Sequence, residues 1–243
     1  MSKGKEATEF TAAANQTLSH GLDWDNREDY EAGGRGFIAT LDDPIIRDPS
    51  GRPVWDLNAF QFLEDESAPP SVNPSLWRQS RLNANYHGLF KVVDGVYQIR
   101  GFDLSVMSIV ATDSGYLVID PLLTPPPAKA GMELVYKHLG RKPIIAVIYT
   151  HSHIDHWGGV KGIISQADVQ AGRVKVIAPN HFMEFAISEN VIAGNVMSRR
   201  ASYMYGNLLP KAPTGQVGAG LGQTTSVGIP TLIAPTDTIT HTG

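Results

Sequence analysis

The stretch from residue 144 to residue 160 constrains this chain more than any other. It opens with a run of apolar, mostly β-branched residues, Ile144 to Ile148, which is typical of a buried strand in a parallel or mixed sheet. Four potential metal ligands then follow within six residues: His151, His153, Asp155 and His156. Sites in open α/β sheets usually lie where strands end. The sequence therefore predicts a metal centre at the carboxyl end of this strand.

The spacing of the ligands predicts two metal positions. Residues two apart in an extended segment point the same way, so His151 and His153 can bind one cation. The chain must turn at Asp155 and His156, which can serve a second cation nearby. Imidazole nitrogen and carboxylate oxygen suit zinc and also other divalent first-row metals. Two ions roughly 3.5–4 Å apart can hold a bridging water. The alternatives are an ordinary surface loop and a chance metal-binding tract.

Composition excludes several other classes of protein. The net charge of −4 and the pI near 6.0 give no basic surplus for nucleic acid. There is no Cys, which excludes disulfides and thiolate ligands. No apolar run approaches the ~20 residues that cross a bilayer. The N-terminus has no apolar core, so we expect a cytoplasmic protein as written, or a periplasmic or secreted one if a signal was removed.

The order of turn signals and apolar patterns predicts an arm followed by a catalytic domain. We expect residues 1–85 to form an N-terminal arm that packs on the domain, and residues 86–243 to form the N-terminal portion of that domain. The predicted elements of the domain are hairpins over 89–100 and 106–120, helices over 125–139 and 160–171, strands over 144–148, 174–178 and 231–234, and a helical stretch over 180–205.

The metal loop also carries a family resemblance. H-x-H-x-D-H after an apolar strand resembles the signature loop of the metallo-β-lactamase superfamily, and the wider context is similar to its alkylsulfatase branch. The blocks that carry the second resemblance are 73–79 (NPSLWRQ), 88–90 (GLF), 96–101 (VYQIRG), 149–159 (YTHSHIDHWGG), 188–190 (SEN) and 197–200 (MSRR). The resemblance implies an α/β fold, the αββα sandwich, with an N-terminal arm.

The resemblance further implies a function for the intact protein. Alkylsulfatases hydrolyse alkyl sulfate esters such as dodecyl sulfate to alcohol and sulfate, with a metal-activated water in a site of two zinc ions. The partners implied are a small amphiphilic sulfate ester and a second copy of the protein in a homodimer, without nucleic acid or stable membrane insertion. Attack at sulfur and attack at carbon both stay open. Two alternatives remain: another hydrolase of the superfamily (a lactonase, thioesterase or lactamase), or a fragment that binds amphiphiles without catalysis.

Several further residues are candidates for the site. We expect Asp155 to take part in catalysis as well as metal binding. By resemblance, Tyr205 lines the sulfate pocket and Asp120 orients the metal-site imidazoles; the alternatives are a packed core Tyr and a turn residue. We interpret His181 as a residue at the N-terminus of a helix, with a metal role as the alternative. We interpret the Arg199-Arg200 pair as solvated or paired, with sulfate binding as the alternative.

The expected ligand set is incomplete. In the alkylsulfatases, further carboxylates and a His follow the metal loop on later strands. The acidic residues after His156 are Asp168, Glu184, Glu189 and Asp237. None of them matches the context of those ligands. We therefore expect this chain to be the N-terminal part of a longer protein, with an incomplete sandwich, and to be inactive alone.

Overall fold

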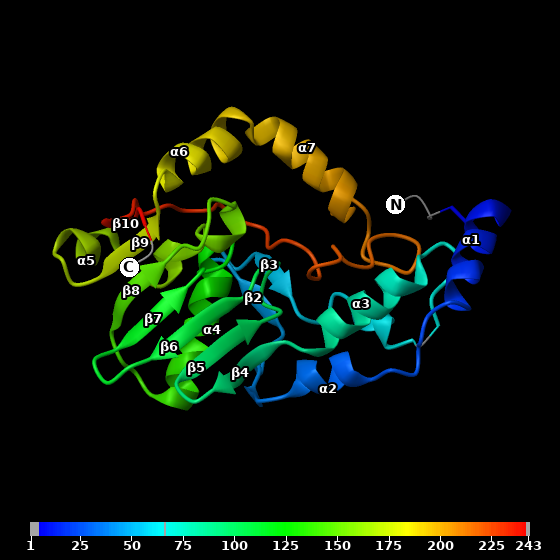
Figure 1. The fold of residues 1–243 in the computed structure, drawn as a ribbon, viewed down its shortest axis with the longest axis horizontal. Coiled ribbons are helices and arrows are strands. Elements are labelled where there is room, and N and C mark those ends of the chain that lie inside the picture. Colours follow the sequence, from blue (N-terminus) through cyan, green and yellow to red (C-terminus); the bar gives the residue numbers. More distant parts are fainter. Residues whose placement is uncertain (1–4, 66, 242–243) are drawn as a thin grey trace.

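A computed structural model describes residues 5–65 and 67–241 and is organised around one large mixed sheet (Figure 1). The order of its eight strands is β1-β4-β5-β6-β7-β8-β9-β10. Their bounds are β1 (Phe37–Ala39), β4 (Gly88–Val93), β5 (Val96–Arg100), β6 (Met107–Ala111), β7 (Tyr116–Ile119), β8 (Ile144–Ile148), β9 (Lys175–Pro179) and β10 (Asp237–Ile239). In this order, neighbouring strands from β1 through β7 pair antiparallel, and neighbouring strands from β7 through β10 pair parallel.

The two predicted hairpins are confirmed. The turn between β4 and β5 contains Gly95 at φ 76°, a conformation that a glycine adopts without steric cost. Leu89 pairs with Ile99 across this hairpin, and Ile109 pairs with Val118 across the next. These four side chains are fully buried. The alternation of apolar residues therefore sets the register of the sheet.

Helix α4 (Pro125–Leu139) is the crossover that makes β7 and β8 parallel, and its predicted bounds are confirmed. Proline residues occupy its first turn, and Gly140 at φ 87° ends it. Ala128, Met132 and Val135 on this helix are buried in the core that the sheet shares. The helix therefore covers one face of the sheet and sets where the carboxyl ends of β7 and β8 meet.

The N-terminal part of the chain adds strand β1 to the sheet and builds a small second core. Its elements are α1 (Glu9–Ser19), α2 (Glu28–Gly34), β2 (Ile45–Arg47), β3 (Pro53–Asp56), a 3-10 turn (Gln61–Glu64) and α3 (Pro74–Asn85). Trp55 joins the main core, whereas Phe60, Leu63 and Trp77 form the smaller one with Val217. Strand β1 pairs with β4 within the large sheet. The division at residue 85 stays a prediction.

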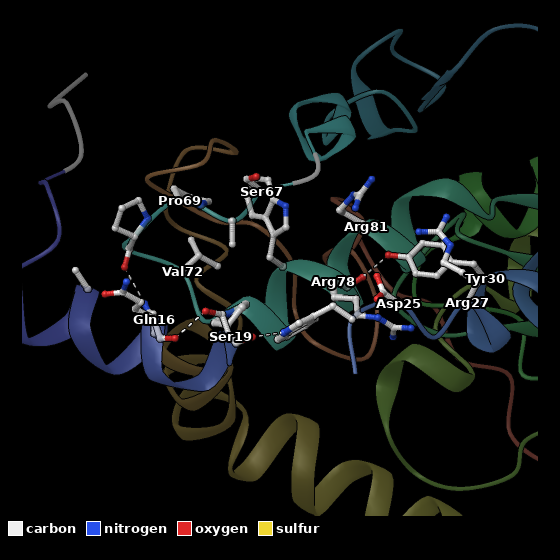
Figure 2. Close-up of a pocket in the computed structure, with 17 residues that line it drawn as sticks. Gln16, Ser19, Asp25, Arg27, Tyr30, Ser67, Pro69, Val72, Arg78 and Arg81 are labelled. Atoms are coloured by element: carbon white, nitrogen blue, oxygen red, sulfur yellow. Dashed lines mark hydrogen bonds between the residues drawn. The ribbon is translucent and has the colours of Figure 1, made fainter. Parts of the chain in front are cut away.

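A cavity of about 920 Å³ lies between α1 and α3, and Figure 2 shows its lining. The guanidinium groups of Arg27 and Arg78 lie over the ring of Tyr30, at 4.5 and 5.2 Å from its centroid. Trp24 and Trp77 supply apolar walls. None of the lining residues belongs to the metal loop.

The region after β8 differs from the predicted elements in two places. Instead of one helix over 160–171, the chain forms a 3-10 turn (Val160–Gly162) and then the short α5 (Gln166–Gln170), whose N-cap is Ser165. A Cβ on Gly162 would meet the Pro125 carbonyl oxygen at 2.2 Å, so this turn is held against α4. The predicted strand over 231–234 is wrong as well, because Thr231 bonds to the metal loop and β10 forms later.

The predicted helical stretch over 180–205 is confirmed as three joined pieces. These are α6 (Phe182–Ile187), a π turn (Ser188–Ile192) and α7 (Gly194–Tyr205). In Figure 1, α6 and α7 form an arch, and the orange-to-red segment returns beneath it.

The described residues thus confirm a mixed α/β fold with one large sheet; the second large sheet of an αββα sandwich is not among them. Across 5–65 and 67–241, none of the helices combines the length and apolar character needed to cross a bilayer.

Candidate metal centre

The loop after β8 brings the four predicted ligands side by side. The ring centroid of His151 lies 4.6 Å from that of His153 and 4.1 Å from that of His156. Asp155 sits with His156 in a 3-10 turn (Ile154–His156), and its Oδ2 lies 3.4 Å from His156 Nε2. That separation is close to the roughly 3.3 Å expected between two ligands of one tetrahedral zinc ion. Their role as ligands stays a prediction.

Hydrogen bonds determine which ring nitrogen of His151 and of His156 keeps a lone pair that can bind a cation. Asp120 Oδ2 lies 2.8 Å from His156 Nδ1, and a carboxylate only accepts, so Nδ1 donates. The Thr150 hydroxyl donates to Asp120 Oδ2 at 2.7 Å. That hydroxyl must therefore accept from His151 Nδ1, which is 2.9 Å away. Both His151 and His156 thus keep the Nε2 lone pair for a cation.

Asp120 is held in an unusual conformation that aims its side chain at the loop. It follows β7 directly, has φ 56° and is buried. Positive φ is uncommon outside glycine, although Asp tolerates it better than most residues. Its carboxylate also accepts from the backbone N–H of Thr150 at 2.8 Å. Asp120 is therefore both the turn residue and a contact of the metal loop. Its role in orienting the metal stays a prediction.

The surroundings shift the pKa values of the imidazoles in opposite directions. Burial lowers the pKa of His151, and the neighbouring His156 and His153 lower it further. Burial also acts to lower the pKa of His156, but the hydrogen bond to Asp120 and the charges of Asp155 and Asp120 outweigh it, so this pKa is raised. His151 is consequently neutral at pH 7 and ready to act as a ligand.

Close backbone packing around two glycines holds the loop in place. A Cβ on Gly158 would lie 2.1 Å from the Leu123 carbonyl oxygen, and a Cβ on Gly159 would lie 2.1 Å from that of Pro121. Within the loop, Trp157 Nε1 donates to the Ser152 carbonyl at 2.8 Å.

Two other segments also bond to the loop. Ser105 Oγ donates to the carbonyl of Asp155. Thr231 N donates to the carbonyl of Gly158 at 2.7 Å.

The remaining candidates fall in different places. Tyr205 ends α7. Burial raises the pKa of its phenol, and the negative charge of Asp155 raises it further. His181 lies at the start of α6, 3.1 Å from Glu184, in line with its reading as a helix N-terminal residue. Arg199 and Arg200 are exposed on α7.

Sequence reasoning missed one acidic residue at the centre. Glu189 Oε1 lies 3.4 Å from His153 Nε2, and Ser152 Oγ donates to Glu189 Oε2 at 3.4 Å. Its only signal in the sequence was membership of the block 188–190. No spacing rule links a helical residue to a loop that precedes it by a whole strand.

The donor set fits a divalent first-row cation, but the coordination sphere is open. Among residues 5–65 and 67–241, no three His, Cys, Asp or Glu side chains already stand in an arrangement that encloses an ion. The loop instead offers adjacent imidazoles with lone pairs kept free by outward hydrogen bonds. Such a site needs either small side-chain movements or further ligands.

Comparisons with known proteins agree with this geometry. A family model described as the metallo-beta-lactamase superfamily matches residues 100–242. A linear primary-alkylsulfatase of Pseudomonas sp. is 53% identical over 240 residues, which are 98% of this chain and 36% of that protein. An (R)-specific secondary-alkylsulfatase of Pseudomonas sp. is 47% identical over 95% of this chain and 35% of its own length.

Solved structures give the same picture. The stereoselective inverting sec-alkylsulfatase of Pseudomonas sp. superposes with a TM-score of 0.92 at 46% identity, over 98% of this chain and 38% of that one. The chain therefore spans about 36% of the length of the curated relatives it matches.

Proposed function

The chain belongs to the metallo-β-lactamase superfamily, and we propose that the intact protein hydrolyses alkyl sulfate esters of the dodecyl sulfate type to an alcohol and inorganic sulfate. Membership of the superfamily implies a divalent metal. The observation that carries the proposal is the convergence of His151, His153 and His156 beside Asp155, in a chain about half identical to a protein named a primary-alkylsulfatase.

We propose zinc as the metal, with two ions. His151 and His153 would hold the first ion, and Asp155 and His156 the second. When bound, such ions neutralise the sulfate and lower the pKa of a water toward ~7, which supplies a nucleophile at neutral pH. The exchange of a sulfate ester for a sulfate ion and an alcohol needs no redox partner.

The protein groups around this pair have separate tasks in the proposal. Asp120 and Thr150 keep the Nε2 lone pairs of His156 and His151 available. Asp155 would hold the second ion, and its carboxylate would orient the attacking water. Tyr205 would donate a hydrogen bond from its phenolic O–H group to a sulfate oxygen, without adding a charge to the site. The raised pKa of Tyr205 keeps that proton in place across the neutral pH range.

We also propose that residues 1–85 form an arm packed on the catalytic domain and that the intact protein is a homodimer. The proposed substrate is amphiphilic. An alkyl tail bound in an apolar site should increase affinity by roughly 0.8 kcal/mol per buried CH₂. A series of alkyl sulfates of rising chain length would therefore show falling KM until the site is filled.

A substrate panel tests the proposal. The intact protein, loaded with Zn²⁺, is given dodecyl sulfate, a β-lactam and an acyl thioester, and the release of each product is measured. We expect inorganic sulfate from dodecyl sulfate, removal of this activity by a chelator, and its loss in His151→Ala. Faster turnover of the lactam or thioester would instead support another hydrolase of the superfamily. Equal sulfate release by His151→Ala would overturn the mechanism.

A further inference from the structure

The cavity between α1 and α3 lies apart from the metal loop, and positive charge dominates its lining. Among the described residues, three arginines line it, Arg27, Arg78 and Arg81, against one carboxylate, that of Asp25. The chain as a whole has a net charge of −4, so this local excess of positive charge runs against its composition. The volume of about 920 Å³ lies within the range of roughly 300–1,000 Å³ found for pockets that hold small molecules. A cavity of this size and charge fits an anionic ligand.

Two of the guanidinium groups keep donors for a ligand. Within the part of the chain that the structure describes, Arg81 donates through Nε to the Leu63 carbonyl at 3.0 Å and through neither Nη atom. Arg27 lies over Tyr30, 4.5 Å from the ring centroid, and pairs with no described carboxylate. Arg78, by contrast, already forms an ion pair at 3.1 Å. Guanidinium groups bind the oxygens of anionic head groups through paired N–H donors.

Apolar side chains supply another part of the lining. Trp24 Nε1 donates to the Ser19 carbonyl at 2.5 Å, so the protein satisfies its indole N–H group and its ring can pack on an alkyl chain. Figure 2 shows Pro69 and Val72 toward the end of the cavity near α1, and Arg27 toward the opposite end. An alkyl chain can therefore lie along one part of the cavity while a charged head group meets the arginines.

One face of helix α1 lines the cavity. Its half-buried lining positions are Ala12, Asn15 and Ser19, whose spacing of three and four residues places them on one face of the helix. Asn15 Nδ2 donates to the carbonyl of Pro70, another lining residue, at 2.8 Å. No residue of α1, all of which is described, is buried. The helix thus lines a cavity without joining a core.

We propose that this cavity binds an anionic amphiphile, with the charged head beside the arginines and the alkyl chain against Trp24. The site is separate from the metal centre and needs no metal. The inference goes beyond the proposed function, because the class of ligand follows from the lining of the cavity and no reaction takes place there. Alkyl sulfates and fatty carboxylates share this chemistry.

Isothermal titration of the 243-residue chain in EDTA tests the site in the absence of metal. The probe is decyl sulfonate, which has no ester bond to hydrolyse, below its critical micelle concentration. We expect one site per chain. Octyl sulfonate should bind about 10–15-fold more weakly, because two fewer methylene groups are buried. Absence of binding, or equal affinity for the two chain lengths, would overturn the proposal.

The head group is tested with two further probes of the same chain length. Decyltrimethylammonium carries the opposite charge and should bind at least about tenfold more weakly than decyl sulfonate. Equal binding of this cation would overturn the anionic character of the site. Decanoate should bind as well. A higher affinity for the sulfonate than for decanoate assigns the site to alkyl sulfates, and the reverse assigns it to fatty carboxylates.

A variant that fills the cavity locates the site. Ala12→Trp places an indole in the cavity from a helix without buried residues, so it should remove decyl sulfonate binding and leave the unfolding free energy unchanged. The matched control is Ala13→Trp, at the neighbouring exposed position of α1 outside the lining, which should bind like the unaltered chain. Equal affinities of the two variants would overturn the cavity as the site.

Removal of charge tests the arginines. Arg27→Gln combined with Arg81→Gln should weaken decyl sulfonate binding at least about tenfold, since both charged donors are lost. Arg47→Gln, at an exposed position of β2 outside the lining, is the control and should bind like the unaltered chain. Unchanged affinity in the double variant would overturn the role of the arginines.

A variant of the metal loop separates this inference from the proposed function. His151→Ala should bind decyl sulfonate as tightly as the unaltered chain does, whatever its effect on sulfate release. Weaker binding in His151→Ala would place the probe at the metal centre and overturn the separate site. Loss of activity in that variant with unchanged binding would support both proposals independently.

Discussion

His156 Nδ1 lies 2.8 Å from Asp120 Oδ2, although 36 residues separate the two in sequence. Asp120 follows β7, and His156 lies in the loop after β8, so the parallel pairing of these strands places both at one edge of the sheet. The left-handed φ of Asp120 turns its carboxylate toward the loop. The pairing of two strands thus determines which nitrogen of His156 is free to bind a cation.

Replacement of Asp120 tests this relationship. Asp120→Asn retains the size of the side chain and tolerates the left-handed conformation, but removes the charge that three donors share. We expect Zn²⁺ affinity to fall about 10–100-fold, as for other outer partners of ligating histidines. Chelator competition measures it, with Asp113→Asn in an exposed turn as the control. Equal affinities of both variants would contradict the role of Asp120.

The pH dependence of metal binding follows from the raised pKa of His156. A proton on this imidazole competes with the metal. The folded-state pKa of His156 lies above the ordinary value of 6.5. As the solution is acidified, Zn²⁺ affinity should therefore begin to fall while the pH is still above 6.5. In Asp120→Asn the largest influence that raises this pKa is lost, so the decline should move to lower pH. The same midpoint in both proteins would show that His156 does not govern it.

Gly159 should be sensitive to any side chain. A Cβ there would lie 2.1 Å from the Pro121 carbonyl oxygen and 2.9 Å from Ala128 Cβ. Gly159→Ala must therefore push the metal loop away from α4, and we expect it to lower the free energy of unfolding by about 1–3 kcal/mol or more and to weaken metal binding.

The matched control is Gly194→Ala at the start of α7, where nothing lies within 4 Å. This change should leave stability unaltered or raise it by up to about 1 kcal/mol, because alanine restricts the unfolded chain. Urea denaturation measures both variants. Equal unfolding free energies for the two would refute the close-packing argument.

Asp103 should make stability rise with acidity. Its buried carboxylate accepts from Ser226 N, Ser226 Oγ and Leu123 N, but burial dominates and raises its pKa from 3.8 to about 6. The charged form is therefore disfavoured in the folded state, and folding becomes more favourable as pH falls from about 6 to about 4. At about 1.4 kcal/mol per pKa unit, the full difference is about 3 kcal/mol.

Comparison with Asp103→Asn isolates this contribution. The asparagine does not titrate, so the unfolding free energy of the unaltered chain minus that of the variant should increase as pH falls from 7 to 4. Urea denaturation at several pH values measures the difference. A difference independent of pH, or one that decreases on acidification, would contradict the buried carboxylate.

Much of the large sheet could be predicted because its signals are local. Alternating apolar residues on either side of Asp94-Gly95 predict one hairpin. The prolines at 125–127 and Gly140 predict the two ends of α4. Helix α1 was not predicted, since none of its residues is buried and it presents no apolar stripe to the core. The predicted helix over 160–171 failed because contact with α4 overrides local propensity.

The candidate site divides in the same way. His151 to His156 form a compact motif, so their grouping could be predicted. Asp120 was a candidate by resemblance, and the parallel pairing of β7 with β8 explains its place. Glu189 reaches the site through the return of α6, and no local pattern encodes that return.

X-ray absorption at the zinc edge tests the central claim most directly, because it reports the atoms around the ion. We predict nitrogen and oxygen ligands at about 2.0–2.1 Å, with the multiple scattering that imidazole rings produce. In a His151→Ala and His153→Ala double variant this imidazole scattering should fall or zinc should no longer bind. Zinc bound without imidazole scattering, or an identical spectrum from the double variant, would contradict a metal centre in the loop after β8.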